Sequence, residues 1–124
     1  YIMPTTTINI DASGKMTAQM IENISFQDSN SSITAQTYVL ELYAAYAYTI
    51  NTLKIISTSG TCTAAVKING TSVTGISAVS VSSTIATGTG TAANTVAVGD
   101  KITLVITSPS SLTDLQASIK TTRI

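Results

Sequence analysis

The sequence predicts an all-β fold, an antiparallel β-sandwich or jelly roll of roughly seven to nine strands that follows an extended N-terminal segment. Apolar and polar residues alternate strictly over most of the chain, and turn signals recur at intervals of about eight to twelve residues. The composition points the same way, because 23 Thr and 16 Ser stand among 124 residues. β-branched residues fit the pleated, half-buried surface of a strand, and the length fits one domain.

The first 35 residues differ from the rest. Residues 5–10 alternate only weakly, residues 12–14 read Ala-Ser-Gly as a turn does, and residues 27–32 read QDSNSS as a polar loop does. We therefore predict an extended N-terminal segment or linker over residues 1–35 and a β-sandwich domain over residues 36–124.

The stretch Ala35–Leu53 admits two interpretations. Its Ala, Leu and Glu content suits a helix, but every second residue from Tyr38 to Ile50 is apolar. No Ser, Thr or Asp cap with a Glu three residues later precedes it. We predict one or two long strands whose apolar face anchors the core.

The clearest hairpin follows. Residues 61–69 alternate strictly, and Asn69-Gly70 then provides the two left-handed residues of a type I′ turn. Residues 64–68 and 71–75 are therefore predicted to pair. The positions expected on the core face are Cys62, Ala64, Val66 and Ile68.

Three more alternating runs complete the domain. Gly99-Asp100 marks a tight connection, and the cluster Ser108–Ser111 is predicted to break the chain. The expected inward positions are Val79, Val81, Ser83 and Ile85, then Ile102, Leu104 and Ile106, and finally Leu115, Ala117 and Ile119.

Charge and composition exclude several classes of function. The formal net charge is zero and the six basic residues are scattered singly, so no basic face for nucleic acid is predicted. No apolar run approaches the roughly 18 to 20 residues of a membrane helix, so no membrane insertion is expected. The scattered basic residues are Lys15, Lys54, Lys67, Lys101, Lys120 and Arg123.

The chain also lacks the side chains of common catalytic and metal sites. It has no His, which removes the base of Ser-His-Asp and Cys-His sites and the commonest zinc ligand. The lone Cys62 is expected in the core, and the six carboxylates show no spacing that selects a catalytic pair. We therefore predict no catalytic residue, cofactor or metal ion, and no enzyme activity.

The tyrosines provide the one candidate contact. Four of the five lie within residues 38–48. By alternation, Tyr43 alone points away from the apolar face, on the side of Glu41, whereas the other three are expected to pack in the core. Tyr43 and Glu41 are therefore the predicted ligand or subunit contact.

The segment from Thr37 to Ile124, about 70% of the chain, carries four motifs in a distinctive order. They are YVLELYAAYAYTI at 38–50, VKINGT at 66–71 with Val73 and Gly75, ANTVAVGD at 93–100, and KTTR at 120–123. In this order they resemble a β-sandwich domain at the C-terminal end of tailed-bacteriophage virion proteins, which are described as tail fibre or phage structural proteins.

The resemblance implies a non-enzymatic module on the particle surface, a tail-fibre or receptor-binding domain that is extracellular as part of the virion. It also implies a homotrimer, with other virion proteins and a host-surface glycan or protein as further partners. Two alternatives stay open. One is a self-assembling structural or capsid-decoration subunit joined by its N-terminal strand. The other is a carbohydrate-binding domain, although Tyr43 is the single candidate for an exposed aromatic row and Trp is missing.

Overall fold

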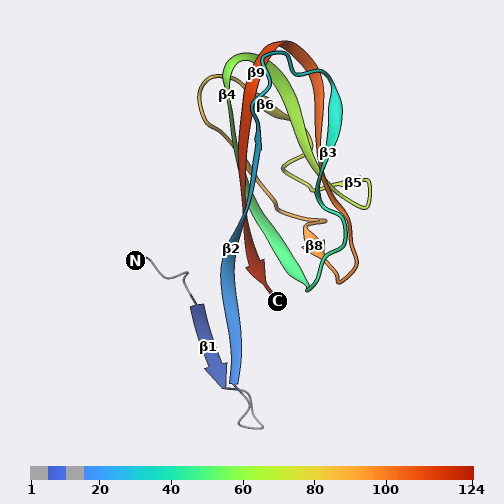
Figure 1. Cartoon of the computed structure of the whole chain (residues 1–124). Coiled ribbons are helices and arrows are strands. Elements are labelled where there is room, and N and C mark those ends of the chain that lie inside the picture. Colours follow the sequence, from blue (N-terminus) through green and yellow to red (C-terminus); the bar gives the residue numbers. More distant parts are fainter. Residues whose placement is uncertain (1–5, 11–15) are drawn as a thin grey trace.

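The structure, a computed structural model, describes residues 6–10 and 16–124 (Figure 1). This part of the chain contains nine strands and no helix, and every strand pair is antiparallel. The strands are β1 (Thr6–Ile10), β2 (Met16–Asp28), β3 (Gln36–Glu41), β4 (Tyr48–Ile68), β5 (Thr71–Ser72), β6 (Val79–Val81), β7 (Ala86–Thr89), β8 (Thr95–Val96) and β9 (Ile102–Arg123). The predicted all-β, antiparallel fold class is confirmed.

Two very long strands organise the molecule. β4 and β9 pair along almost their whole length, from Tyr48 opposite Arg123 to Ile68 opposite Ile102. The register shifts near Gly60, and Figure 1 shows the paired ribbon folding over at the end of the molecule opposite the C-terminus. Gly60 has a φ of +80° and lies against the backbone of Ser111, where a Cβ atom would collide with the carbonyl oxygen. Only glycine fits this bend.

The folded ribbon contributes one half to each of two layers. In the first layer, β2 and β7 flank the second half of β9 and the first half of β4. In the second layer, β3 and β6 flank the first half of β9 and the second half of β4. The bend divides β4 and β9 into two halves each, which together with β2, β3, β6 and β7 makes eight strands. In chain order, β2 pairs with the second half of β9, β3 with the first half of β9, the first half of β4 with β7, and the second half of β4 with β6. This nested pairing makes the sandwich a jelly roll.

The core lies between the layers and follows the predicted alternation. Each large apolar side chain that is fully buried stabilises the fold by roughly 1.5–3 kcal/mol. The turn at Asn69-Gly70 forms as predicted, with φ of 50° and 84°. The predicted pairing of residues 64–68 with 71–75 is limited to two residue pairs, Ile68 opposite Thr71 and Lys67 opposite Ser72, and Ala64 pairs with Val79 of β6 instead. The predicted inward residues that are buried are Cys62, Ala64, Val66, Ile68, Val79, Val81, Ile102, Leu104, Ile106, Leu115, Ala117 and Ile119.

The sandwich begins earlier than the predicted boundary at residue 36. Ile21–Asp28 of β2 pair with Leu115–Thr122 of β9, and Ile24 and Phe26 pack against the core. The alternation of apolar and polar residues in Ile21–Asp28 is short and is flanked by polar residues. The sequence pattern therefore placed this strand in the N-terminal segment. β1 pairs with Met16–Met20, before β2 joins the sandwich. The predicted turn at 12–14 lies outside the described residues.

The stretch Ala35–Leu53 forms two strands, as one form of the prediction has it, but the apolar face is interrupted. β3 ends at Glu41 and β4 begins at Tyr48, and Leu42 between them is 71% exposed. The loop 42–47 connects the second layer to the first, and only Ala44 within it is fully buried. The alternation of apolar and polar positions stops in this loop, because the chain passes there from one layer to the other.

Two other expectations were wrong. Ser108–Ser111 does not interrupt the strand, because β9 runs through it; Ser108 and Ser111 adopt φ near +50° and bend the strand instead. Ile85 is 61% exposed and Ser83 is exposed as well, because β6 ends at Val81 and the connection that follows leaves the core.

Candidate interaction surface

Three tyrosines join the core to acidic side chains. Tyr48 is buried, and Tyr38 and Tyr46 are half-buried, so all three pack as expected. Each hydroxyl group donates a hydrogen bond to a carboxylate. The pairs are Tyr38 with Asp28 (2.6 Å), Tyr48 with Glu41 (2.9 Å) and Tyr46 with Glu22. Alternation gave no signal for these bonds, because the partners are up to 24 residues apart in the chain.

The hydrogen bonds close one side of the sandwich. Asp28 and Glu22 belong to β2 in the first layer, whereas Tyr38 belongs to β3 in the second layer and Tyr46 to the loop that follows β3. Burial, then the bond to Glu41, raise the pKa of Tyr48 above its ordinary value of 10. These three carboxylates are therefore hydrogen-bonded parts of the fold.

Two aromatic contacts strengthen the same side. The rings of Phe26 and Tyr38 lie 4.6 Å apart between centroids, and the Arg123 guanidinium lies 3.9 Å from the centroid of Tyr46. A cation over an aromatic ring contributes about 0.5–1 kcal/mol at an exposed site. Arg123, near the end of β9, is thereby held against the loop that connects β3 to β4.

Tyr43 is exposed, but Glu41 is not free. Tyr43 is 69% exposed, and its ring lies against the backbone of Gly99. Glu41 is half-buried, and its carboxylate accepts the bond from Tyr48. Of the two predicted contact residues, Tyr43 therefore has the accessible side chain, and its role as a contact stays a prediction.

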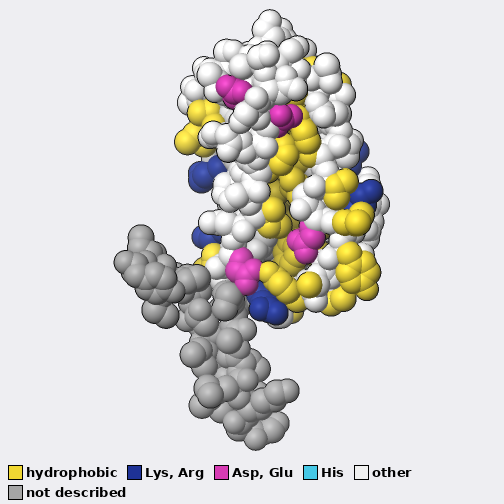
Figure 2. All heavy atoms as spheres, viewed as in Figure 1, with side chains coloured by type: hydrophobic (Ala, Val, Ile, Leu, Met, Phe, Trp, Pro, Cys, Tyr) yellow, Lys and Arg dark blue, Asp and Glu magenta, His cyan; other side chains and the backbone are white. Residues whose placement is uncertain are grey.

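Two apolar neighbours that alternation did not identify accompany Tyr43. Leu42 is 71% and Val98 60% exposed. Backbone bonds hold their two loops together, from Ala44 N–H to Asp100 O (2.9 Å) and from Gly99 N–H to Ala44 O (2.8 Å). We call Leu42, Tyr43 and Val98 the end patch. Figure 2 shows apolar side chains gathered at this lower end of the molecule, where the C-terminus lies (Figure 1).

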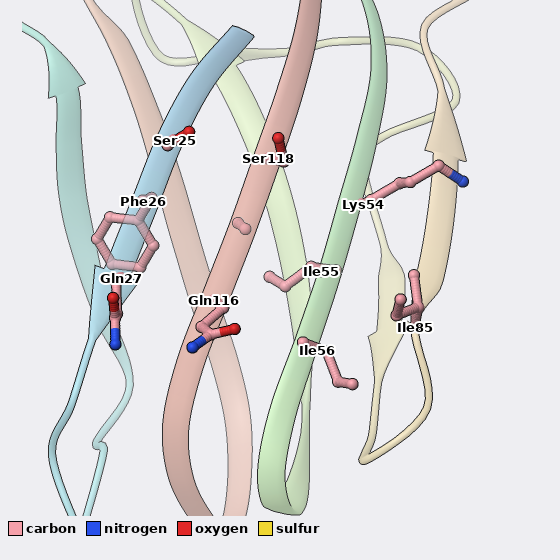
Figure 3. Close-up of a pocket in the computed structure, with 10 residues that line it drawn as sticks. Ser25, Phe26, Gln27, Lys54, Ile55, Ile56, Ile85, Gln116 and Ser118 are labelled. Atoms are coloured by element: carbon pink, nitrogen blue, oxygen red, sulfur yellow. The ribbon is translucent and has the colours of Figure 1, made fainter. Parts of the chain in front are cut away.

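A shallow groove of about 540 Å³ crosses the outer face of the first layer (Figure 3). Its polar side chains come from neighbouring strands, because Ser25 of β2 and Lys54 of β4 both lie opposite Ser118 of β9. Ile56 and Ile85 add apolar surface, and Lys54 donates to Thr87 over 3.0 Å. Amides, hydroxyls and one ammonium group can bind polar ligands, but no carboxylate lines the groove to act as an acid or base.

The opposite end of the sandwich, at the fold of the ribbon, has a different surface. We call it the bend end. A hollow of about 580 Å³ is lined there mainly by hydroxyl residues, among them Ser31, Ser32, Ser59, Ser111 and Thr113. Its chemistry is that of hydroxyl groups and backbone amides.

The remaining chemistry is limited. Cys62 is buried, and burial raises the pKa of its thiol, so the nucleophilic thiolate is disfavoured. Among the described residues, no three His, Cys, Asp or Glu side chains gather as metal ligands would. No helix in that part of the chain has the length and apolar character to cross a membrane.

No protein-family model matches this chain, and no curated protein or solved structure does either.

Proposed function

We propose that this chain is a non-enzymatic structural module on the surface of a bacteriophage particle, a tail-fibre or receptor-binding module that forms a homotrimer. The observation that supports the homotrimer is the end patch, whereas the bacteriophage role rests on the resemblance of residues 37–124. Leu42, Tyr43 and Val98 are each at least 60% exposed and lie together on two tied loops. Clustered exposed apolar residues mark contact surfaces, and Tyr is enriched in them.

The position of the patch supports a role in assembly. It lies at the end of the sandwich where the C-terminus is and past which β2 runs toward β1 (Figure 1). Contact with the neighbouring copies and with other virion proteins is proposed at this end. The bend end then faces away from the particle, toward a host-surface glycan or protein.

The chemistry of the rest of the surface agrees with an inert display module. Charged residues make up 10% of the chain, and hydroxyl side chains keep the outer faces soluble. Three of the six carboxylates accept hydrogen bonds from tyrosines, and these three carboxylates therefore help to hold the fold together. Jelly rolls occur in viral capsid and lectin domains, an analogy at the level of fold alone.

The mass of the full chain in solution tests this proposal. Light scattering over a wide range of concentrations should give a trimer, and the protein should bind bacterial envelope preparations without releasing sugars or peptides from them. A single chain at every concentration would contradict the homotrimer. Release of soluble products from the envelopes would contradict the non-enzymatic role.

A capsid-decoration or other structural subunit joined by its N-terminal strand is the second candidate. β2 favours it, because the strand continues from the sandwich to Met16 and pairs there with β1. A chain that starts at Ile21 separates the two candidates, because it lacks β1 and the part of β2 that precedes the pairing with β9. The fibre module should remain a trimer, whereas a subunit joined by its N-terminal strand should become a single chain.

A carbohydrate-binding domain is the third candidate, and the groove in Figure 3 favours it. Gln27 and Gln116 provide amides there, and Ile56 provides an apolar floor for a sugar ring. Stacking on an exposed aromatic row is not available in this groove, since Phe26 is the one aromatic residue among its lining and is half-buried. Binding of a neutral and of an acidic polysaccharide in gel retardation, abolished by Gln116→Ala, would favour this candidate.

A further inference from the structure

The strand register of the first layer brings together two lysines that are far apart in the sequence. Gln116, Ser118 and Lys120 of β9 alternate with buried residues and are all exposed. Ser118 lies opposite Lys54 of β4, and Lys120 lies opposite Thr52, two residues before Lys54. Diagonal neighbours on one face of a sheet are about 7–8 Å apart, within reach of long side chains. One ligand on the outer face of this layer can therefore contact both ammonium groups.

The two lysines stand on interior strands. The first half of β4 has β9 on one side and β7 on the other, and the second half of β9 lies between β2 and β4. The face that carries Lys54 and Lys120 is therefore the flat side of the sheet, and its accessibility does not depend on an open edge.

Neutral hydrogen-bonding groups surround the lysines, and most of them line the groove in Figure 3. β2 places three exposed residues directly opposite those of β9, and β7 provides the hydroxyl group that accepts the hydrogen bond of Lys54. These residues are Asn23, Ser25, Gln27 and Thr87. Hydroxyl and amide groups both donate and accept hydrogen bonds, as the hydroxyl groups of a sugar do. From Gln116 to Lys120 the face extends about 13 Å along the strands, which suits an oligosaccharide better than a single ion.

The acidic groups nearest in the chain do not neutralise this face. Among the described residues that line the groove, none is acidic. Glu22 and Asp28 alternate with the exposed residues of β2, and both carboxylates accept bonds from tyrosines on the other side of that strand. Asp114 lies in an adjoining hollow, toward the bend end. The groove therefore has a positive charge that no acidic side chain of its own lining offsets.

The second layer provides a comparison, because its outer face also has two lysines. Lys67 and Lys101 line a hollow there together with Asn69. The Asn69 amide donates to the Asp100 carboxylate over 2.9 Å, so a negative charge lies beside these two lysines. Charge complementarity therefore favours an acidic ligand on the first layer rather than on the second.

We propose that the outer face of the first layer binds a chain of an acidic polysaccharide. Lys54 and Lys120 contact its carboxylate groups, and the surrounding amides and hydroxyls bond to its sugar hydroxyl groups. The inference rests on the proposed receptor-binding role and names the class of host-surface glycan. The face adjoins the bend end, which is the end proposed to face the host.

The composition of the groove also indicates how strong this contact is and which polymer it disfavours. Exposed ion pairs contribute little each, so a single chain should bind weakly, and three copies in the homotrimer should gain avidity on one polymer. Single-stranded nucleic acid binds on aromatic platforms. Among the described lining residues Phe26 is the one aromatic side chain, and it is half-buried.

Matched polymers test the inference on the full wild-type chain. The acidic probes are polygalacturonate, alginate and hyaluronate, and the neutral control is the methyl ester of polygalacturonate, which has the same sugar backbone. Calorimetry at low salt should show that at least one acidic probe binds about tenfold more tightly than the ester, and that about 0.5 M salt weakens this binding. Equal binding of the ester would overturn the inference.

Two further polymers separate glycan recognition from attraction to any polyanion. Polyglutamate and a single-stranded oligodeoxynucleotide carry negative charge without the hydroxyl groups of a polysaccharide, and both should bind more weakly than the acidic glycan. Equal or tighter binding of either polymer would overturn the inference, because charge alone would then be sufficient.

A matched pair of double variants tests the assigned face. Lys54→Gln with Lys120→Gln removes two charges from the first layer, and Lys67→Gln with Lys101→Gln removes the same number from the second. Equal thermal midpoints and far-ultraviolet circular dichroism would show that both variants fold. We expect an affinity loss of about tenfold for the first variant and less than about twofold for the second. Equal losses would overturn the inference, because affinity would then follow net charge.

Amide chemical shifts of the unmodified chain give an answer that needs no substitution. Added acidic polysaccharide should change the shifts of residues 52–56 and 116–120, on the first layer, and leave those of residues 63–67 and 103–107, on the second, unchanged. Changes confined to the second layer would overturn the assigned face.

Failure of this inference and failure of the proposed function are distinguishable. No binding to any of the three acidic polysaccharides overturns the inference, whereas a trimer that binds bacterial envelopes would leave the proposed function standing. A single chain that binds acidic polysaccharide through Lys54 and Lys120 would contradict the homotrimer and support the inference.

Discussion

The two ends of this jelly roll are closed in different ways. At the bend end, the backbone closes the sandwich, since Gly60 and Ser111 have left-handed φ values and the Ser57 hydroxyl donates to Gly60 O over 3.0 Å. At the other end, side chains close it, through Tyr46, Tyr48 and their carboxylate partners. The bend end exposes hydroxyl groups, whereas the other end exposes the apolar end patch.

The two ends differ in whether their exposed side chains are needed for the fold. The bend is made by backbone conformation at Gly60 and Ser111, and the hollow beside it is lined mainly by hydroxyl side chains, while Ile33 and Leu112 are buried there. The loops at the other end are held by Ala44 and Asp100, which leaves Leu42 and Tyr43 free to face outward. Of the two ends, substitutions should therefore affect stability more at the bend end and association more at the end patch.

Among the substitutions that compare the two ends, Gly60→Ala should have the largest effect on stability. A Cβ atom at Gly60 would collide with the backbone of Ser110 and Ser111, and φ is +80°. We expect a loss of about 3 kcal/mol in the free energy of unfolding, measured by urea denaturation. Gly70→Ala is the control, since its φ is +84° but no atom lies within 4 Å of the added Cβ, and it should lose only about 1 kcal/mol. Equal losses would contradict a steric role for Gly60.

Tyr48→Phe should have the next largest effect. It removes the bond to Glu41 and leaves that half-buried carboxylate without its phenol partner. We expect a loss of about 1–2 kcal/mol in the free energy of unfolding. Tyr43→Phe serves as the control and should be neutral, because Tyr43 is exposed. A neutral Tyr48→Phe would show that the hydroxyl bond does not hold this end together.

Alkaline pH should weaken the same end. Burial and the bond to Glu41 raise the pKa of Tyr48 above 10, so at about pH 11 the folded chain keeps a proton that the unfolded chain has lost. The contribution of Tyr48 to the free energy of unfolding is therefore fully present below pH 10, and it should be lost as the pH rises above that value. Urea midpoints from neutral pH to about pH 11 should fall less steeply in Tyr48→Phe than in the wild type. Identical slopes would refute this linkage.

A smaller effect is expected from Asp100→Asn. The Asp100 carboxylate accepts hydrogen bonds from Ala97 N–H (2.9 Å) and the Asn69 amide (2.9 Å), which lower its pKa below 3.8. The stability it contributes is present at neutral pH and is lost as the pH falls through the lowered pKa. The variant should therefore melt slightly earlier than the wild type at pH 7, and this difference should shrink in acid. A constant difference would exclude the charge as its cause.

The smallest effect on stability is expected at the end patch. Replacing Leu42, Tyr43 and Val98 together by Ser removes exposed side chains, so each change should alter the free energy of unfolding by less than about 0.5 kcal/mol. Urea denaturation of the dissociated protein checks this. A large loss of stability would mean that the patch supports the fold.

Alternation and turn chemistry were sufficient to predict the strands with local signals. The hairpin at Asn69-Gly70 and the buried faces around Val66 and Leu104 followed from residues that are neighbours in the chain. Ile21–Asp28 were missed as a strand of the sandwich, because their pairing with β9 joins segments almost a hundred residues apart.

The candidate surface was only partly predictable for a related reason. Tyr43 could be identified because alternation placed it outside the core, and it is exposed. Leu42 was assigned to the core, because the sequence does not show where the chain changes layer. Val98 comes close to the loop of Tyr43 only through the backbone bonds between Ala44, Gly99 and Asp100, which no local pattern encodes.

The mass of three proteins in solution tests the contrast between the two ends most directly. They are the wild type, the Leu42→Ser, Tyr43→Ser, Val98→Ser variant, and a bend-end variant in which the exposed Thr58, Ser59 and Thr61 are replaced by Ala. We predict that the wild type and the bend-end variant form trimers, and that the end-patch variant is a single folded chain at the same concentration. A trimeric end-patch variant, or a bend-end variant that dissociates, would contradict the assignment of assembly to the tyrosine-bearing end.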